Sequence, residues 1–337
     1  MADGDRDAAE PATSVRRSVD VSALITAARE GDPRSVARLI SLVEDEHPTL
    51  REVMAGLAPH TGAARVVGLT GAPGVGKSTS TSALVAGYRR QGLRVGVLAV
   101  DPSSPFTGGA ILGDRVRMQE HAVDPGVYIR SMSSRGHLGG LAATTPQAVR
   151  VLEAAGCDVV LVETVGVGQA EVEVASLADT TVVLLAPGMG DAIQAVKAGI
   201  LEIADVFAVN KADRDGVDNT VRDIRGMIAL GQRSPGEWRP SIVKTVASRG
   251  LNAGSGLDEL LGAIDKHREW LVDHGELERR RRARAAAEIE AIAIAAVRGQ
   301  IVARQDGAML ESLAGKVAGG SLDAYAAADE LMQGLEI

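Results

Sequence analysis

A glycine-rich segment around residue 75 ends in a lysine and a serine, a combination that can hold a phosphate group. The pattern Gly71-x-x-x-x-Gly76-Lys77-Ser78 follows a β-branched run that starts at Arg65, and it precedes a segment compatible with a helix. Glycines let the backbone wrap so that successive N–H groups point at phosphate oxygens, and a helix N-terminus adds positive charge. Lys77 supplies a mobile cation, and the Ser78 hydroxyl can ligate Mg²⁺. The order of strand, loop and helix therefore predicts a phosphate-binding loop. We expect the phosphate contacts to come from Gly71, Ala72, Pro73, Gly74, Val75, Gly76, Lys77, Ser78 and Thr79.

A second chemical pattern, Asn210-Lys211-Ala-Asp213, follows a strand-like run. It resembles the guanine-specificity motif of GTPases. The carboxylate of Asp213 can accept hydrogen bonds from N1–H and the exocyclic amine of guanine, whereas adenine has no such donor pair on that edge. The motif therefore predicts GTP rather than ATP as the nucleotide. By the same resemblance, Asn210 braces the neighbouring loop and the stem of Lys211 packs along the base. Further contacts to the base would come from Val246, Ala247 and Ser248.

Acidic residues at the ends of strand-like runs could bind a metal ion or sense the terminal phosphate. Glu163 ends one such run, and Gly166 follows three residues later, where its N–H could meet the γ-phosphate. Asp101 ends another run, and Asp114 lies in the glycine-rich segment beyond it. Mg²⁺ prefers hard oxygen ligands, so Ser78 with one or two of these acids would suffice. Taken singly, each acid is an ordinary cap or surface charge; taken together at one edge of a sheet, they favour a metal shell.

The segment around Glu163 looks like a Walker B element followed by a second switch, with glutamate in place of the more usual aspartate. Gly166 is followed by Val167, and a valine cannot orient the attacking water as a glutamine does in Ras-type enzymes. We therefore predict slow intrinsic GTP hydrolysis that a partner accelerates. We assign catalysis to Lys77, Asp101, Glu163 and Gly166, and metal binding to Ser78, Asp101, Asp114 and Glu163.

Seven short β-rich runs alternate with helical stretches in the middle of the chain. This rhythm predicts an α/β fold of the P-loop NTPase class, with a mostly parallel central sheet flanked by helices and with helical extensions at both ends. Ligands of such sheets bind at the carboxyl ends of the strands, where the motifs above lie. We expect strands at 66–69, 95–100, 127–129, 159–162, 182–185, 206–209 and 242–246.

Helical patterns flank the predicted sheet on both sides. Apolar residues at helical spacing between residues 20 and 58 predict two or three helices, and an alanine- and isoleucine-rich helix is expected at 285–302. An apolar face on this last helix needs a cover, either a second subunit or the core of the chain itself. The run Arg279–Arg282 could bind an acidic partner or simply be solvated. We divide the chain into a disordered tail at 1–18, an N-terminal helical segment at 19–60, a P-loop GTPase domain at 61–272 and a C-terminal helical dimerisation segment at 273–337.

The composition excludes several classes of function. The 337 residues carry a net charge of -8, whereas nucleic-acid binders need a basic surplus. The single cysteine, Cys157, excludes an internal disulfide and a cysteine-rich metal site, and it fits a reducing compartment. No apolar run reaches the length of a membrane span, and the N-terminus lacks an apolar secretory core. We therefore expect a cytoplasmic protein that binds neither nucleic acid nor membranes.

Five segments together resemble the methylmalonyl-CoA mutase-associated GTPases of the MeaB/ArgK type, which are P-loop GTPases. They are 71–79, 101–118, 134–140, 163–169 and 210–213, of which 101–118 is far more specific than a phosphate loop. The resemblance implies a homodimeric G-protein chaperone that assists adenosylcobalamin loading, protection or reactivation of methylmalonyl-CoA mutase through hydrolysis of GTP to GDP with Mg²⁺. The cobalamin belongs to the partner. The resemblance also implies an additional switch toward the mutase at Asp191, Gln194 and Lys197, for which a plain loop and helix start is the alternative.

Three other functions stay open. A GTPase metallochaperone that inserts nickel would need a cluster of cysteine or histidine ligands, and the six histidines are scattered. An ATP-dependent kinase of a transport-associated binding protein disagrees with the guanine motif. A nucleotide-gated assembly module with negligible hydrolysis is compatible with Val167 after the switch glycine. Turnover of GTP and ATP, with and without the mutase, separates these functions.

Overall fold

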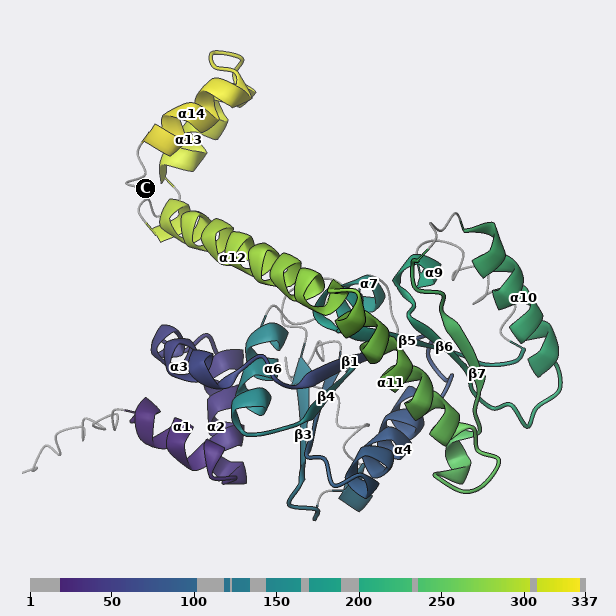
Figure 1. Cartoon of the computed structure of the whole chain (residues 1–337). Helices are drawn as coiled ribbons and strands as arrows, with labels where there is room; N and C mark the ends of the chain where they lie inside the picture. Colours follow the sequence, from purple (N-terminus) through teal and green to yellow (C-terminus); the bar gives the residue numbers. More distant parts are fainter. Residues whose placement is uncertain are drawn as a thin grey trace, which may run out of the picture. The chain divides into compact units, whose positions relative to one another are not determined.

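The computed structural model describes residues 19–101, 118–121, 123–133, 144–164, 170–188, 200–231, 236–303 and 308–333. In these ranges the chain forms a sheet of seven parallel strands in the order β3-β2-β4-β1-β5-β6-β7 (Figure 1). All seven predicted strands are present, although the strand predicted at 127–129 continues to Ser133 and the one predicted at 242–246 ends at Lys244. The sheet is parallel throughout rather than mostly parallel. The strands are β1 (Arg65–Thr70), β2 (Val95–Asp101), β3 (Val127–Ser133), β4 (Val159–Thr164), β5 (Thr180–Leu185), β6 (Val206–Val209) and β7 (Ser241–Lys244).

Helices cover both faces of the sheet, which explains why the central strands are apolar along their whole length. Every residue of β4 and β5 is buried. Neighbouring residues of one strand belong to opposite cores: Val160 packs in the cluster with α6, and Leu161 packs in the cluster with α4. The described helices of the first unit are α1 (Val21–Arg29), α2 (Pro33–Glu44), α3 (Leu50–Leu57), η1 (Ala58–His60), α4 (Lys77–Arg90), η2 (Gln119–His121), α6 (Thr145–Ala154), α7 (Ala170–Leu177), α9 (Ile200–Ile203), α10 (Val217–Leu230) and η3 (Ala247–Arg249), and α11 (Leu257–Asp273) begins in this unit.

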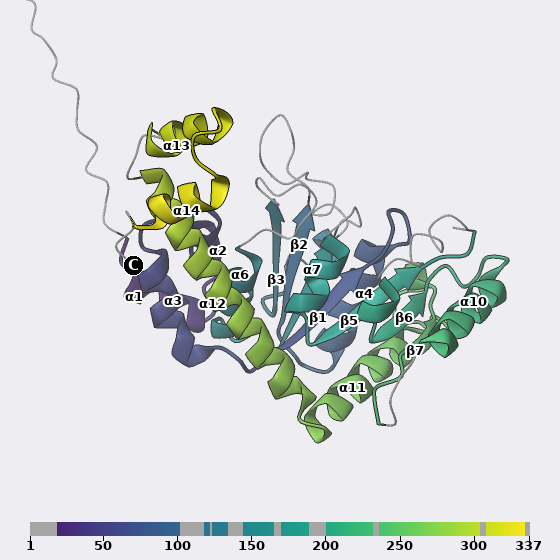
Figure 2. The ribbon, with the colours of Figure 1, turned by 90° about the horizontal axis from the view of Figure 1, so that it is seen from above.

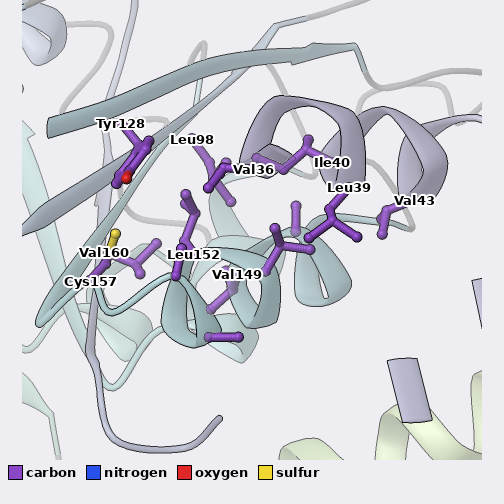
Figure 3. Packing of buried hydrophobic residues seen from close by; sticks show 14 of the residues in the cluster. Val36, Leu39, Ile40, Val43, Leu98, Tyr128, Val149, Leu152, Cys157 and Val160 are labelled. Carbon is purple, nitrogen blue, oxygen red and sulfur yellow. The ribbon is translucent and has the colours of Figure 1, made fainter. Parts of the chain in front are cut away.

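The N-terminal helices α1, α2 and α3 share a core with the sheet domain. They lie at the β3 end of the sheet, whereas α10 lies at the end formed by β6 and β7 (Figures 1 and 2). Figure 3 shows the apolar side of α2, including Leu39, facing α6, including Val149. At the edge strand, Arg130 forms an ion pair with Glu44, and the Tyr128 hydroxyl donates to the Gly31 carbonyl at 3.1 Å. The N-terminal segment is therefore part of the folded sheet domain.

The chain divides into two compact units, Met1–Ile264 and Asp265–Ile337, and the division falls within α11. The second unit contains the end of α11 followed by α12 (Glu276–Ala303), α13 (Ala308–Ala318) and α14 (Ala324–Gln333). The helix predicted at 285–302 is present, but it begins at Glu276. The arginine run lies in this helix, where Glu276 pairs with Arg279 and Glu278 pairs with Arg282 across one turn, contacts worth about 0.2–0.5 kcal/mol each. The four-segment division made from the sequence stays a prediction, and the tail at 1–18 lies outside the described residues.

Candidate nucleotide-binding site

The glycine-rich loop joins the end of β1 to the start of α4, the predicted order of strand, loop and helix. Two of its glycines cannot be replaced without a clash. A Cβ on Gly71, whose φ is +143°, would lie 2.3 Å from the Leu184 carbonyl oxygen. A Cβ on Gly76, whose φ is +98°, would lie 2.4 Å from Nδ2 of Asn210. The two glycines thus let the loop lie against the ends of β5 and β6, with the N-terminus of α4 at its exit.

Lys77 lies over this loop. Its Nζ donates to the carbonyl oxygens of Gly71 at 2.7 Å and Ala72 at 3.1 Å, and the side chain is buried. A cation that is held by backbone carbonyls at the first residue of a helix is close to the position where an entering phosphate would meet the N–H groups. The phosphate oxygens could then take over the contacts that the carbonyls make with Lys77.

The structure brings two of the predicted metal ligands, Ser78 and Glu163, together. Glu163 lies near the end of β4 with 3% of its surface exposed, and Leu69 of β1 is its register partner. The Ser78 hydroxyl donates to Oε1 of Glu163 at 2.6 Å, and the Thr81 hydroxyl donates to Oε2 at 2.8 Å. The carboxylate is thus held by hydroxyls from the first turns of α4. A hydroxyl and a carboxylate side by side are hard oxygen donors of the kind that Mg²⁺ takes, so this pair fits the predicted ion.

Asn210 connects three segments through its side chain. Its Nδ2 donates to the Val75 carbonyl at 2.8 Å, and its Oδ1 accepts from the Ala247 backbone N–H at 3.0 Å and the Thr245 hydroxyl at 3.3 Å. The side chain is 3% exposed. Next to it, Nζ of Lys211 donates to the Gly74 carbonyl at 2.6 Å. The end of β6 is therefore fastened to the phosphate loop on one side and to the loop after β7 on the other.

The turn that follows presents Asp213 to solvent. Lys211 has a φ of +57°, an uncommon conformation for a residue with a side chain, and such positions cluster at functional sites. The Ala212 N–H donates to the Thr245 carbonyl at 3.0 Å, which ties the turn to the segment before η3. In that segment Ala247 is buried and Ser248 is exposed. An exposed carboxylate on a braced turn is able to accept two hydrogen bonds from a base edge.

Several predicted site residues cannot be placed. Asp101 is the last residue of β2, beside β4, but its side chain lies outside the described part of the chain. Asp114, Gly166, Asp191, Gln194 and Lys197 also lie outside the described residues. The described residues contain no group of three or more His, Cys, Asp or Glu that could hold a metal ion. None of the described helices has both the length and the apolarity of a membrane span.

Comparison with known proteins places these features in a family. The model of one family, the methylmalonyl-CoA mutase-associated GTPase MeaB, matches residues 36–306, which is more than half of the chain. The chain belongs to the MeaB family. This confirms the resemblance inferred from the five sequence segments.

Individual relatives of this MeaB-family chain agree with the assignment. A protein from Pyrococcus abyssi is 46% identical over 315 residues, covering 93% of this chain and 96% of the relative. The GTPase ArgK of Escherichia coli K12 is 38% identical over 257 residues, covering 74% of this chain and 76% of its own. A solved structure described as a LAO/AO transport system kinase has a TM-score of 0.71 at 27% identity, covering 95% of this chain and 99% of its own. The fold of the chain is that of a P-loop GTPase.

Two contacts in this MeaB-family site do not follow from the order of residues along the chain. Thr81 was not expected to touch Glu163, although its spacing of three residues from Ser78 places both hydroxyls on one face of α4. Lys77 was expected to be mobile and instead bonds to carbonyls of its own loop. Both contacts depend on how β4 and the loop lie against α4, which is tertiary information that no spacing along the chain contains.

Proposed function

We propose that this MeaB-family GTPase binds GTP with Mg²⁺, hydrolyses it slowly when alone, and acts as a G-protein chaperone of adenosylcobalamin-dependent methylmalonyl-CoA mutase. The observation that carries the nucleotide assignment is the side-chain bridge from Asn210 and Lys211 to the carbonyls of the phosphate loop. It joins the segment that would read a base to the segment that would hold phosphates. The exposed carboxylate of Asp213 beside that bridge favours guanine.

In this proposal different residues bind the phosphates, bind the metal ion and contact the γ-phosphate. The backbone N–H groups of the loop and Nζ of Lys77 bind phosphate oxygens, and the buried position of Lys77 strengthens this attraction. The oxygens of Ser78 and Glu163 hold Mg²⁺, which when bound offsets negative charge on the phosphates. Asp101 and Asp114 complete the metal shell, and the Gly166 N–H senses the γ-phosphate. The lack of a glutamine after Gly166 keeps hydrolysis slow.

The chaperone role is supported by membership of a family described by its association with the mutase. We place the communication with the mutase at Asp191, Gln194 and Lys197, and the cobalamin in the partner. We also propose a homodimer through the second unit, because α12 exposes large apolar side chains: Ile289 is 68%, Ile292 52% and Ile294 60% exposed. Such a protein acts in the cytoplasm, without nucleic acid or membrane partners.

The test is a turnover experiment with the purified chain, alone and with methylmalonyl-CoA mutase, using ATP as the control nucleotide. We expect slow GTP turnover, a rise in rate when the mutase is added, and no ATP turnover. Equal use of ATP and GTP would contradict the guanine assignment. Phosphate transfer from ATP to a transport-associated binding protein would instead support the kinase function named for the solved structure. GTP turnover that ignores the mutase would contradict the chaperone role.

A further inference from the structure

Two hydroxyls of α4 hold the two oxygens of one buried carboxylate. Ser78 Oγ lies 2.6 Å from Oε1 of Glu163, and Thr81 Oγ1 lies 2.8 Å from Oε2. Both hydroxyl-bearing residues are buried, with Ser78 6% and Thr81 0% exposed. Because residues three apart lie on the same side of a helix, α4 presents this pair of donors toward the end of β4. The orientation of the carboxylate is thus set by side chains on the helix that follows the phosphate loop.

The hydroxyls of Ser78 and Thr81 differ in whether they would also contact the metal ion. In the proposed function the oxygen of Ser78 faces Mg²⁺, so its contact with Glu163 changes when the site is loaded. Oγ1 of Thr81 also lies 3.0 Å from the Lys77 carbonyl oxygen, but the hydroxyl has a single proton, which goes to the nearer carboxylate oxygen, Oε2 of Glu163 at 2.8 Å. Threonine in a helix has two preferred χ1 rotamers, and the one seen here places Oγ1 within hydrogen-bond distance of Glu163. Its contact with Oε2 can persist whether or not the site is loaded.

We infer that Thr81 is a positioning residue of the metal site: its hydroxyl fixes Oε2 of Glu163 and so leaves Oε1 aimed at the place where Ser78 and the ion meet. This inference rests on the proposed Mg²⁺-dependent binding of guanine nucleotide. Groups that orient a metal-ligating carboxylate strengthen metal binding without touching the metal themselves. Removal of the Thr81 hydroxyl should therefore weaken Mg²⁺ binding and leave the binding of nucleotide without metal unchanged.

A simpler explanation is that the Thr81 hydroxyl only bonds to the carbonyl four residues earlier, as helical threonines commonly do. Such a bond would have no effect on metal binding. The chain offers a matched control for that role. Thr220 on α10 is 4% exposed, and its hydroxyl donates to the Gly216 carbonyl, four residues earlier, at 3.3 Å. Thr220→Val removes the same atom from the same kind of helical contact, at a position that makes no hydrogen bond to Glu163. Thr81→Ser is the complementary variant, because it keeps the hydroxyl and removes only the methyl group.

The experiment follows the release of a fluorescent GDP analogue from the full chain at a series of Mg²⁺ concentrations, with EDTA as the metal-free point. For wild type we expect Mg²⁺ to slow release. For Thr81→Val we expect the Mg²⁺ concentration at half effect to rise about tenfold, in the range typical of residues that orient metal ligands. Release in EDTA should stay within about twofold of wild type. Thr81→Ser should restore the wild-type midpoint, and Thr220→Val should not move it.

The outcomes separate the inference from the proposed function. If wild type retains GDP in a Mg²⁺-dependent manner but Thr81→Val has an unshifted midpoint, the positioning role is refuted and the proposed function stands. The same holds if Thr81→Ser fails to restore the midpoint, or if Thr220→Val shifts it equally. Faster release in EDTA from Thr81→Val would show a structural role in the phosphate loop and would also refute the inference. A wild-type chain that does not bind the GDP analogue would overturn both proposals.

Discussion

Replacing Asn210 tests whether its side chain unites the base-reading and phosphate-holding segments. Asn210→Ala removes three hydrogen bonds, to the Val75 carbonyl, the Ala247 N–H and the Thr245 hydroxyl. Each is worth about 0.5–1.5 kcal/mol net, and the buried groups left behind lose their partner, so we expect a loss of about 3 kcal/mol in the free energy of unfolding. Tertiary unfolding in urea, followed by tryptophan fluorescence, measures this loss. Trp238 lies in the first unit and Trp270 in the second, so a Trp270→Phe background restricts the signal to the unit that contains Asn210.

The same substitution should weaken GDP binding, because the nucleotide must then order the two loops itself. If all of the expected loss of about 3 kcal/mol is taken from the loop arrangement that binds GDP, the affinity for GDP drops about a hundredfold, since each 1.4 kcal/mol is a factor of about ten. Asn219→Ala is the control: Asn219 is an exposed residue on α10 whose side chain accepts only from Arg222, at 3.2 Å, among the contacts described, and it should change stability by less than about 0.5 kcal/mol. Asn210→Asp tests the contact with Val75 alone. It keeps Oδ1 and replaces Nδ2, the donor to the Val75 carbonyl, with a charged oxygen. The bridging role is refuted if Asn210→Ala unfolds and binds GDP as the control does.

Three further predictions follow from other side chains. Asp213→Asn should weaken GTP binding and reduce the preference for guanine over adenine, measured by competition with ATP; an unchanged preference would refute the base-reading role. The hydrogen bond from Arg89 holds the pKa of Asp124 below its ordinary value of 3.8, so the ion pair stabilises the fold above about pH 4 and is lost as the pH falls through the lowered pKa. The difference in unfolding free energy between wild type and Asp124→Asn should therefore be constant near neutral pH and shrink in acid, and a difference that grows in acid would contradict this sign. Burial raises the pKa of the Cys157 thiol to about 12, so iodoacetamide should modify the folded chain far more slowly than the urea-unfolded chain; equal rates would show that the thiol is not protected.

The parts of the fold that the sequence predicts are those with a local cause. Strand β4 is recognisable because a buried parallel strand needs an unbroken apolar, β-branched run, and the phosphate loop is recognisable because its glycines, lysine and serine each have a separate task. The strand order is different: nothing in the run that forms β4 says that it lies between β2 and β1. This placement is what brings Glu163 to Ser78, so the sequence predicts both residues as metal ligands but does not show that they touch.

The helical parts show two features that the sequence pattern does not reveal. The helix that begins at Glu276 starts earlier than its apolar pattern does, because ion pairs one turn apart stabilise a polar stretch that hydrophobic periodicity does not detect. The helical pattern between residues 20 and 58 predicts helices but says nothing about what their apolar sides meet. In the structure Leu39 and Val43 belong to the same core as Val160 of the central sheet.

That shared core has a practical consequence for anyone who wishes to isolate the nucleotide-binding part of this chain. A chain shortened to begin at residue 61 would lose α1, α2 and α3 and would expose the apolar side of α6 together with Tyr128 on the edge strand. Contiguous apolar surface of this kind makes proteins associate. The fragment would therefore tend to aggregate before its nucleotide chemistry could be studied. A soluble fragment therefore has to begin before Val21. The N-terminal helices are a structural part of the folded domain, because they cover its apolar surface.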